Sequence, residues 1–124
     1  MKNKEKWTPS KLVLKDGRLT ASRDTSEVSV GSRLIVDIIG ELYQSFIPEH
    51  AKGRLLDLGC GKVPLYEMYK DYVSDTVCVD WANSLHDNQF VDIRCDLSEK
   101  LTIPDGQVET IILSDVMEYL PKPE

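Results

Sequence analysis

The feature that most constrains the fold is an alternation of short apolar runs with segments of helical periodicity. Each run is too short for a helix and is bounded by glycine, proline or charged residues, which indicates a buried strand. The four runs lie near residues 54–58, 76–80, 90–94 and 110–114. Strands that alternate with helices form right-handed βαβ units. The sequence therefore predicts an α/β fold with a parallel sheet.

Two helices are expected, near residues 33–46 and 64–72. Ser32 can cap the first helix and Pro48 can close it. Apolar residues recur in this helix at steps of one, three and four, which predicts a single buried stripe. The stripe comprises Leu34, Ile35, Ile38, Ile39, Leu42, Tyr43 and Phe46. Pro64 suits the first position of the second helix, because its missing N–H costs nothing there.

The N-terminal segment, residues 1–29, differs from the rest of the chain. It is polar, shows no sustained period, and has turn chemistry at Lys15, Asp16 and Gly17. We expect this polar arm to be mobile or loosely docked. Residues 30–124 then form the folded domain.

Composition excludes several classes of protein. The 124 residues suit a single domain, and 41% of them are hydrophobic, which is enough for a core. The formal net charge is −6, and the lack of long basic runs argues against nucleic-acid binding. No apolar stretch approaches the roughly 20 residues that span a bilayer, and no secretion signal is evident. We expect a soluble, cytoplasmic protein.

The three cysteines do not predict a metal site. Cys60, Cys78 and Cys95 lack CxxC spacing, and the chain offers only His50 and His86 as imidazole companions. We expect reduced, partly buried thiols.

A candidate site follows the first strand, in the segment LLDLGCGKVPLYE at residues 55–67. In a parallel sheet, ligands bind at the carboxyl ends of the strands, and four acidic residues fall at such ends: Asp57, Asp80, Asp96 and Asp115. Asp80 follows Gly59 by about 20 residues, the interval that brings a second carboxylate to a ribose diol. The alternative is that a strand-to-helix turn contains glycine only because of the backbone conformation of the turn, without any ligand. A carboxylate beside an apolar run needs a partner, which favours a nucleoside-type site.

Four segments resemble, in this order, the first conserved segments of the class I S-adenosylmethionine-dependent methyltransferases. They read LLDLGCGKVPLYE, VCVDWAN, CDLSEKLTIPDGQVETI and ILSDVMEYLPKPE, and the match covers about residues 53–120. The segment IPDGQVETIILSDVMEYLPKP most resembles the methyltransferase type 11 group, whose acceptors are mostly small molecules, lipids or sugars. The resemblance implies a Rossmann-like doubly wound parallel sheet with strand order 3-2-1-4.

The resemblance also implies roles for matching residues around S-adenosylmethionine. The methionine part would meet residues after the first and fourth strands: Asp57, Gly59, Cys60, Gly61, Ser114 and Asp115. The ammonium group of the cofactor would lie near Asp57. The nucleoside part would meet Asp80 at the ribose, Trp81 along the adenine face, and Asp96 and Leu97 at the adenine edge.

Two of these roles have structural alternatives. Trp81 can be an ordinary packed tryptophan. Asp96 can cap the turn that follows it. Glu118, beyond the fourth strand, reads as surface charge and not as a catalytic group.

The chain departs from the family pattern in two places. Val63 stands where many members have a third glycine, and Pro64 follows it, so the dinucleotide fingerprint GxGxxG is broken. The sequence also stops at Glu124, where family members continue with further strands that build much of the acceptor pocket. We therefore expect the cofactor-binding half of the fold, truncated after the fourth strand.

The expected function is methyl transfer from S-adenosylmethionine to a small-molecule, lipid or sugar acceptor. This chemistry needs alignment and exclusion of water more than a dedicated base, and no catalytic residue is identified. One alternative is a non-catalytic module or inactive remnant that holds the cofactor or a partner. A nucleotide-binding oxidoreductase is less favoured. The exposed edge of the fourth strand could promote self-association.

Overall fold

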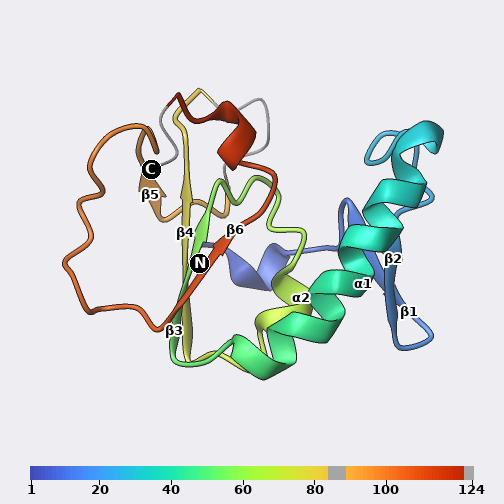
Figure 1. Cartoon of the computed structure of the whole chain (residues 1–124), viewed down its shortest axis with the longest axis horizontal. Coiled ribbons are helices and arrows are strands. Elements are labelled where there is room, and N and C mark those ends of the chain that lie inside the picture. The colour runs from blue at the N-terminus through green and yellow to red at the C-terminus, as the bar shows by residue number, and fades with distance from the viewer. Residues whose placement is uncertain (84–88, 122–124) are drawn as a thin grey trace.

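The computed structural model describes residues 1–83 and 89–121 of the chain. It has a mixed α/β fold built on a four-stranded parallel sheet, with strands in the order β5-β4-β3-β6 (Figure 1). The strands are β3 (Arg54–Leu58), β4 (Asp75–Asp80), β5 (Ile93–Arg94) and β6 (Thr110–Leu113). Each lies on one of the four predicted runs, so the parallel α/β sheet predicted from the alternation is confirmed.

The central strands are the most buried part of the sheet. Leu55 and Leu56 of β3 are at most 2% exposed, and Cys78 and Val79 of β4 are fully buried. Strands covered on both faces read as continuous apolar runs, as these do. The edge strand β5 is shorter than predicted, and the buried Phe90 and Val91 lie before its start.

The N-terminal segment is a packed element, and the expectation of a loosely docked arm is wrong. Strands β1 (Leu12–Lys15) and β2 (Arg18–Ala21) form an antiparallel hairpin around the turn at Asp16 and Gly17. Leu12, Leu19 and Ala21 of this hairpin are at most 3% exposed and belong to the main core. Strands of four residues are too short to show a clear sequence period, which is why the hairpin was missed.

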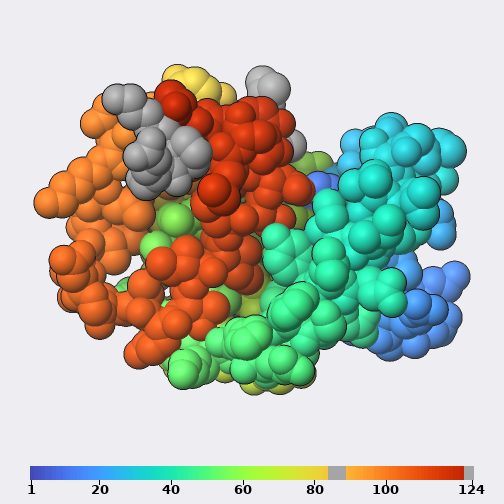
Figure 2. All heavy atoms as spheres, viewed as in Figure 1, coloured from blue at the N-terminus to red at the C-terminus, as the bar shows by residue number. Residues whose placement is uncertain are grey.

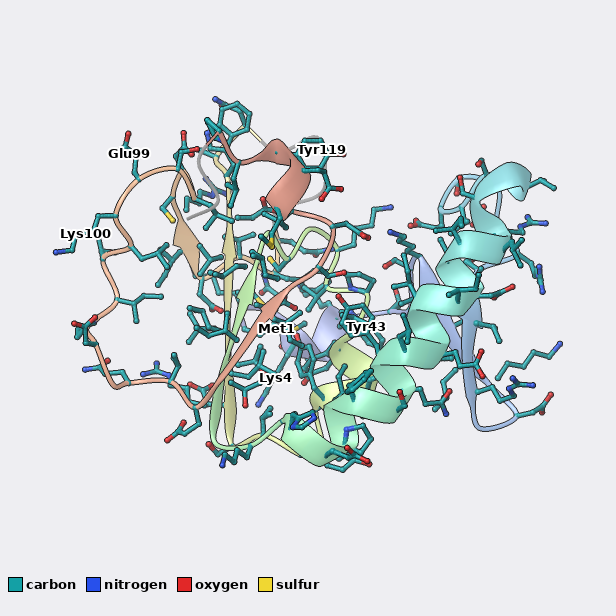
Figure 3. All side chains as sticks on the ribbon, viewed as in Figure 1. Met1, Lys4, Tyr43, Glu99, Lys100 and Tyr119 are labelled. Carbon is teal, nitrogen blue, oxygen red and sulfur yellow. The ribbon has the colours of Figure 1, made fainter. Side chains whose placement is uncertain are left out.

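Short 3₁₀ turns flank the hairpin at η1 (Lys4–Lys6) and η2 (Val30–Ser32). Ahead of η1, the amino group of Met1 forms an ion pair of 3.0 Å with Asp92 Oδ2 and donates a hydrogen bond to the carbonyl oxygen of Thr76. The start of the chain therefore lies against β4, near the middle of the view in Figure 3.

Helix α1 (Arg33–His50) packs against the hairpin through side chains that bond the edge of β2. Asp37 Oδ1 accepts the N–H of Ala21 at 2.6 Å, and Gln44 Oε1 accepts the N–H of Leu19 at 2.9 Å. Gly40 allows this approach, because a Cβ there would lie 2.9 Å from the Leu19 carbonyl oxygen. Hydrogen bonds and close packing thus fix which face of α1 meets the hairpin.

The prediction of which face of α1 is buried is wrong. Five of its seven members are about half exposed or more: Leu34, Ile35, Ile38, Leu42 and Phe46. The buried positions are instead Val36, Gly40 and Ile47, and the helix runs past Pro48 to His50. In Figure 2, α1 crosses the right side of the molecule in cyan to green with its surface open to the viewer.

The second helix is shorter than predicted. Helix α2 (Tyr66–Tyr69) is a single turn, preceded by a loop of tight turns from Gly59 to Leu65. Beyond β6, a last 3₁₀ turn, η3 (Met117–Tyr119), crosses the top of the sheet, while Glu99 and Lys100 point outward from the loop after β5 (Figure 3).

The outer edge of the sheet is formed by β6. Among the described residues no strand pairs with its outer side, and Ile111 on this strand is 58% exposed. Self-association through this edge stays a prediction. None of the helices in the described part of the chain is long and apolar enough to cross a membrane.

Candidate functional site

The ten predicted site residues gather at the carboxyl edge of the sheet, around two adjoining cavities. The first, here called the loop cavity, has a volume of about 250 Å³ and is lined by Asp57, Gly59, Cys60, Gly61, Ser114 and Asp115. The second, the Trp81 cavity, has a volume of about 430 Å³ and is lined by Asp80, Trp81, Asp96 and Leu97. Gly59 and Asp115 line both cavities, so the two spaces meet there.

The backbone N–H groups of the glycine loop are already occupied. Gly59 and Cys60 both donate to the carbonyl oxygen of Val79, at 2.8 and 3.2 Å. Gly61 donates to Asp80 Oδ2 at 2.9 Å. Helix α2 has a single turn, so its dipole adds little to the attraction of an anion. These three amides therefore have protein acceptors and are not free to bind an anion.

The loop contains a strained residue where the family pattern has glycine. Val63 has a φ of 55°, in the left-handed region that β-branched residues rarely adopt, and it is fully buried. Trp7 Nε1 donates to the Val63 carbonyl oxygen at 3.0 Å, and the Trp7 ring packs edge-on against Tyr66. Burial and this contact from the N-terminal segment hold the strained conformation in place.

Asp57 is buried in the floor of the loop cavity. It is 4% exposed, and its Oδ2 accepts a hydrogen bond from the Tyr69 hydroxyl at 3.0 Å. Burial raises the pKa of Asp57 to about 7, with a further rise from the charge of Asp80 and an opposing effect of the Tyr69 hydrogen bond. A cationic ligand group beside Asp57 would restore its ionised form.

Cys60 points into the protein. It is 2% exposed, and its thiol pKa is raised by a hydrogen bond with the Cys78 thiol, by burial and by nearby carboxylates. A thiol in this state is a poor nucleophile, so Cys60 contributes backbone and packing to the cavity.

Asp80 lines the Trp81 cavity and also binds the glycine loop. Its Oδ2 holds the N–H of Gly61, and its Oδ1 accepts the N–H of Trp81 at 2.7 Å. A carboxylate offers about four acceptor positions, so capacity remains for hydroxyl groups in the Trp81 cavity. Asp80 thus fixes the glycine loop while lining the other space.

The remaining residues of the Trp81 cavity are more open. Trp81 is 51% exposed, which disfavours the alternative of an ordinary packed tryptophan. Asp96 caps the next turn by accepting the N–H of Ser98 at 2.8 Å, as the alternative for this residue expected. Leu97 is half-buried beside it, and Glu118 is exposed on η3.

The N-terminal segment supplies residues that sequence reasoning did not connect with the site. Lys11 Nζ lies 2.6 Å from Asp115 Oδ2, and Lys62 Nζ lies 2.5 Å from Glu27 Oε1. Ser10 also lines the loop cavity. These partners are far apart along the chain, so no local motif could have revealed them.

Val116 packs over Gly59 where the two cavities meet. A Cβ at Gly59 would lie 2.4 Å from Val116 Cγ2, so the bare backbone of this glycine is covered by a side chain from beyond β6. Gly59 has a φ of 70°, which also requires glycine. A ligand that spans both cavities therefore passes beside Val116.

Comparison of this chain with protein-family models, curated proteins and solved structures found no match.

Proposed function

We propose that this protein binds S-adenosylmethionine across the two cavities and transfers its methyl group to a small-molecule, lipid or sugar acceptor. The observation that carries the proposal is the division of the ten candidate residues. Those that the resemblance assigns to the methionine part line the loop cavity, and those assigned to the nucleoside line the Trp81 cavity. Gly59 and Asp115, both assigned to the methionine part, line the two cavities where they meet.

The topology supports the proposal. Counted from Arg54, the order β5-β4-β3-β6 reads third, second, first, fourth, as in the cofactor half of a Rossmann-like doubly wound sheet. The site lies where chain order reverses beside β3, the position at which such sheets bind ligands.

The chemistry of the cavities suits this cofactor. Bound S-adenosylmethionine supplies a methyl group on a sulfonium, an already activated leaving group. Asp57 would pair with the ammonium group, Asp80 with the ribose hydroxyls, and the exposed ring of Trp81 with the adenine face. Asp96, beside Leu97, retains acceptor capacity for the exocyclic amino group. The protein then contributes orientation and exclusion of water.

A dinucleotide oxidoreductase is less well supported. Such enzymes cradle a pyrophosphate with free backbone amides at a glycine-rich helix start. Here Gly59, Cys60 and Gly61 donate to protein acceptors, and Pro64 has no N–H.

A non-catalytic cofactor-binding module is the second candidate. It is favoured by one observation: at the place where the cavities meet, Val116 covers Gly59 and Asp115 is held in an ion pair with Lys11.

Isothermal titration tests the proposal. We expect S-adenosylhomocysteine to bind and NAD to give no signal. A methyl-transfer assay with radiolabelled S-adenosylmethionine and candidate small acceptors then separates the enzyme from the binding module. If NAD binds and S-adenosylhomocysteine does not, both the methyltransferase and the module that binds S-adenosylmethionine are rejected.

A further inference from the structure

The loop cavity contains a buried hydroxyl group without a partner. Ser10 is 5% exposed and lines this cavity, and its Oγ makes no hydrogen bond to any of the described residues. A buried polar group that lacks a partner is unfavourable, and such groups are uncommon in folded proteins. The same residue type elsewhere in the segment is satisfied, since Ser22 Oγ accepts the N–H of Asp24.

The position of Ser10 is fixed by its neighbours. Trp7 is bonded to Val63 on one side, and Leu12, at the start of β1, is 3% exposed in the core on the other. The hydroxyl is therefore held beside the glycine loop by packing that does not depend on the hydroxyl itself.

The cavity also combines both signs of charge. Lys11 follows Ser10 and lines the cavity with its ammonium group held by Asp115, which is 45% exposed. Asp57 lies in the buried floor. A ligand that carries a cation and an anion close together matches this arrangement better than a ligand with one charge.

We propose that Ser10 and Lys11 form the subsite for the α-carboxylate of an amino-acid ligand group, with Asp57 receiving its α-ammonium. Ser10 donates its hydroxyl proton to one carboxylate oxygen, and Lys11 supplies a positive charge that Asp115 holds in place. The N-terminal hairpin thereby becomes part of the binding site. This inference rests on the proposed function, in which the amino-acid group is the methionine part of the cofactor.

The test compares two ligands by isothermal titration. S-adenosylhomocysteine carries both charges, and its decarboxylated analogue keeps the ammonium group without the carboxylate. We expect Ser10→Ala and Lys11→Met each to weaken S-adenosylhomocysteine binding about tenfold, the usual loss for a hydrogen bond to a charged group, and to leave binding of the analogue unchanged. Ser45→Ala and Lys15→Met, on exposed positions away from the cavities, should bind both ligands as the unaltered protein does.

Thermal unfolding supplies an independent readout. Because Ser10 Oγ has no protein partner among the described residues, Ser10→Ala should keep or raise the melting temperature while it weakens binding. A purely structural serine would lower the melting temperature and affect both ligands alike.

The outcomes separate the two proposals. Normal S-adenosylhomocysteine binding by both variants, or equal losses for the two ligands, would overturn the carboxylate subsite alone. Failure of the unaltered protein to bind either ligand would overturn the proposed function and the subsite with it.

Discussion

The two cavities at the carboxyl edge of the sheet are built in different ways. Most residues of the Trp81 cavity lie at or shortly after the ends of β3, β4, β5 and β6, so strand positions bring them together. The loop cavity needs the N-terminal hairpin as well, through contacts such as that of Lys11 with Asp115, 104 positions apart. A site made by strand ends can be foreseen from local patterns, whereas a site closed by a distant segment cannot.

The largest expected effect comes from Asp80, which lines the Trp81 cavity and also holds the glycine loop. Asp80→Ala should weaken S-adenosylhomocysteine binding by about 1–3 kcal/mol and should also lower thermal stability, because the Gly61 N–H loses its acceptor. Titration calorimetry and thermal unfolding measure the two effects. Asp96→Ala is the matched comparison, since among the described residues this exposed carboxylate accepts one hydrogen bond, from the N–H of Ser98, and its removal should cost less in both measurements.

If Asp80→Ala folds and binds as tightly as the unaltered protein, Asp80 does not belong to the site. Its role would then be confined to holding the glycine loop.

A smaller effect is the pH dependence of ligand binding, which we expect to arise from Asp57 in the loop cavity. Since Asp57 has a pKa of about 7 in the folded protein, above its ordinary value, the ligand ammonium group should favour the ionised form and release a proton on binding. Affinity for S-adenosylhomocysteine should rise roughly tenfold between pH 6 and pH 8. Titrations in buffers of different ionisation enthalpy would count the released proton.

Stability should change with pH in the opposite sense. The raised pKa means that the folded protein binds the proton more tightly than the unfolded chain does. The contribution of Asp57 to the free energy of unfolding is therefore greatest at acidic pH, and it falls as pH rises from about 4 to about 7. In Asp57→Asn this dependence and the pH effect on binding should both disappear. Their persistence would assign the titration to another group.

The smallest effect concerns the boundary between the cavities. Val116→Ala removes the side chain that covers Gly59 and that also lines the Trp81 cavity, so a ligand that spans both cavities should bind a few-fold more tightly, whereas adenosine, confined to the Trp81 cavity, should gain less. Competition titrations with the two ligands measure this difference. Weaker binding of S-adenosylhomocysteine would mean that Val116 packs against the ligand instead of obstructing it.

The positions of the strands were predictable because their signals are local. Each of the four runs had the length and boundaries of a buried strand, and pairing followed from the alternation with helices. The acidic residues at the strand ends were predictable for the same reason. The length of helix α2 was overestimated. The strained turn at Val63 delays the start of this helix, and a periodic sequence pattern contains no information about backbone strain.

The orientation of α1 shows where local pattern fails. Its apolar stripe has the spacing of a buried face, yet Leu34 and Phe46 are more than half exposed. Asp37 and Gln44 turn the helix toward β2, because the edge of that strand offers N–H groups that need acceptors. Periodicity marks which residues share a face, and only the neighbouring element decides which face is covered.

The sequence by itself determined the parallel sheet and the gathering of Asp57, Asp80, Asp96 and Asp115 at one of its edges, since both follow from short-range spacing. Only the tertiary structure decided that the N-terminal segment folds as a hairpin and brings Ser10 and Lys11 to the glycine loop. It also decided how each carboxylate is solvated, and so why burial raises the pKa of Asp57 to about 7 while exposed Asp96 caps a turn. Burial and long-range contacts depend on the whole packed chain, which no short segment encodes.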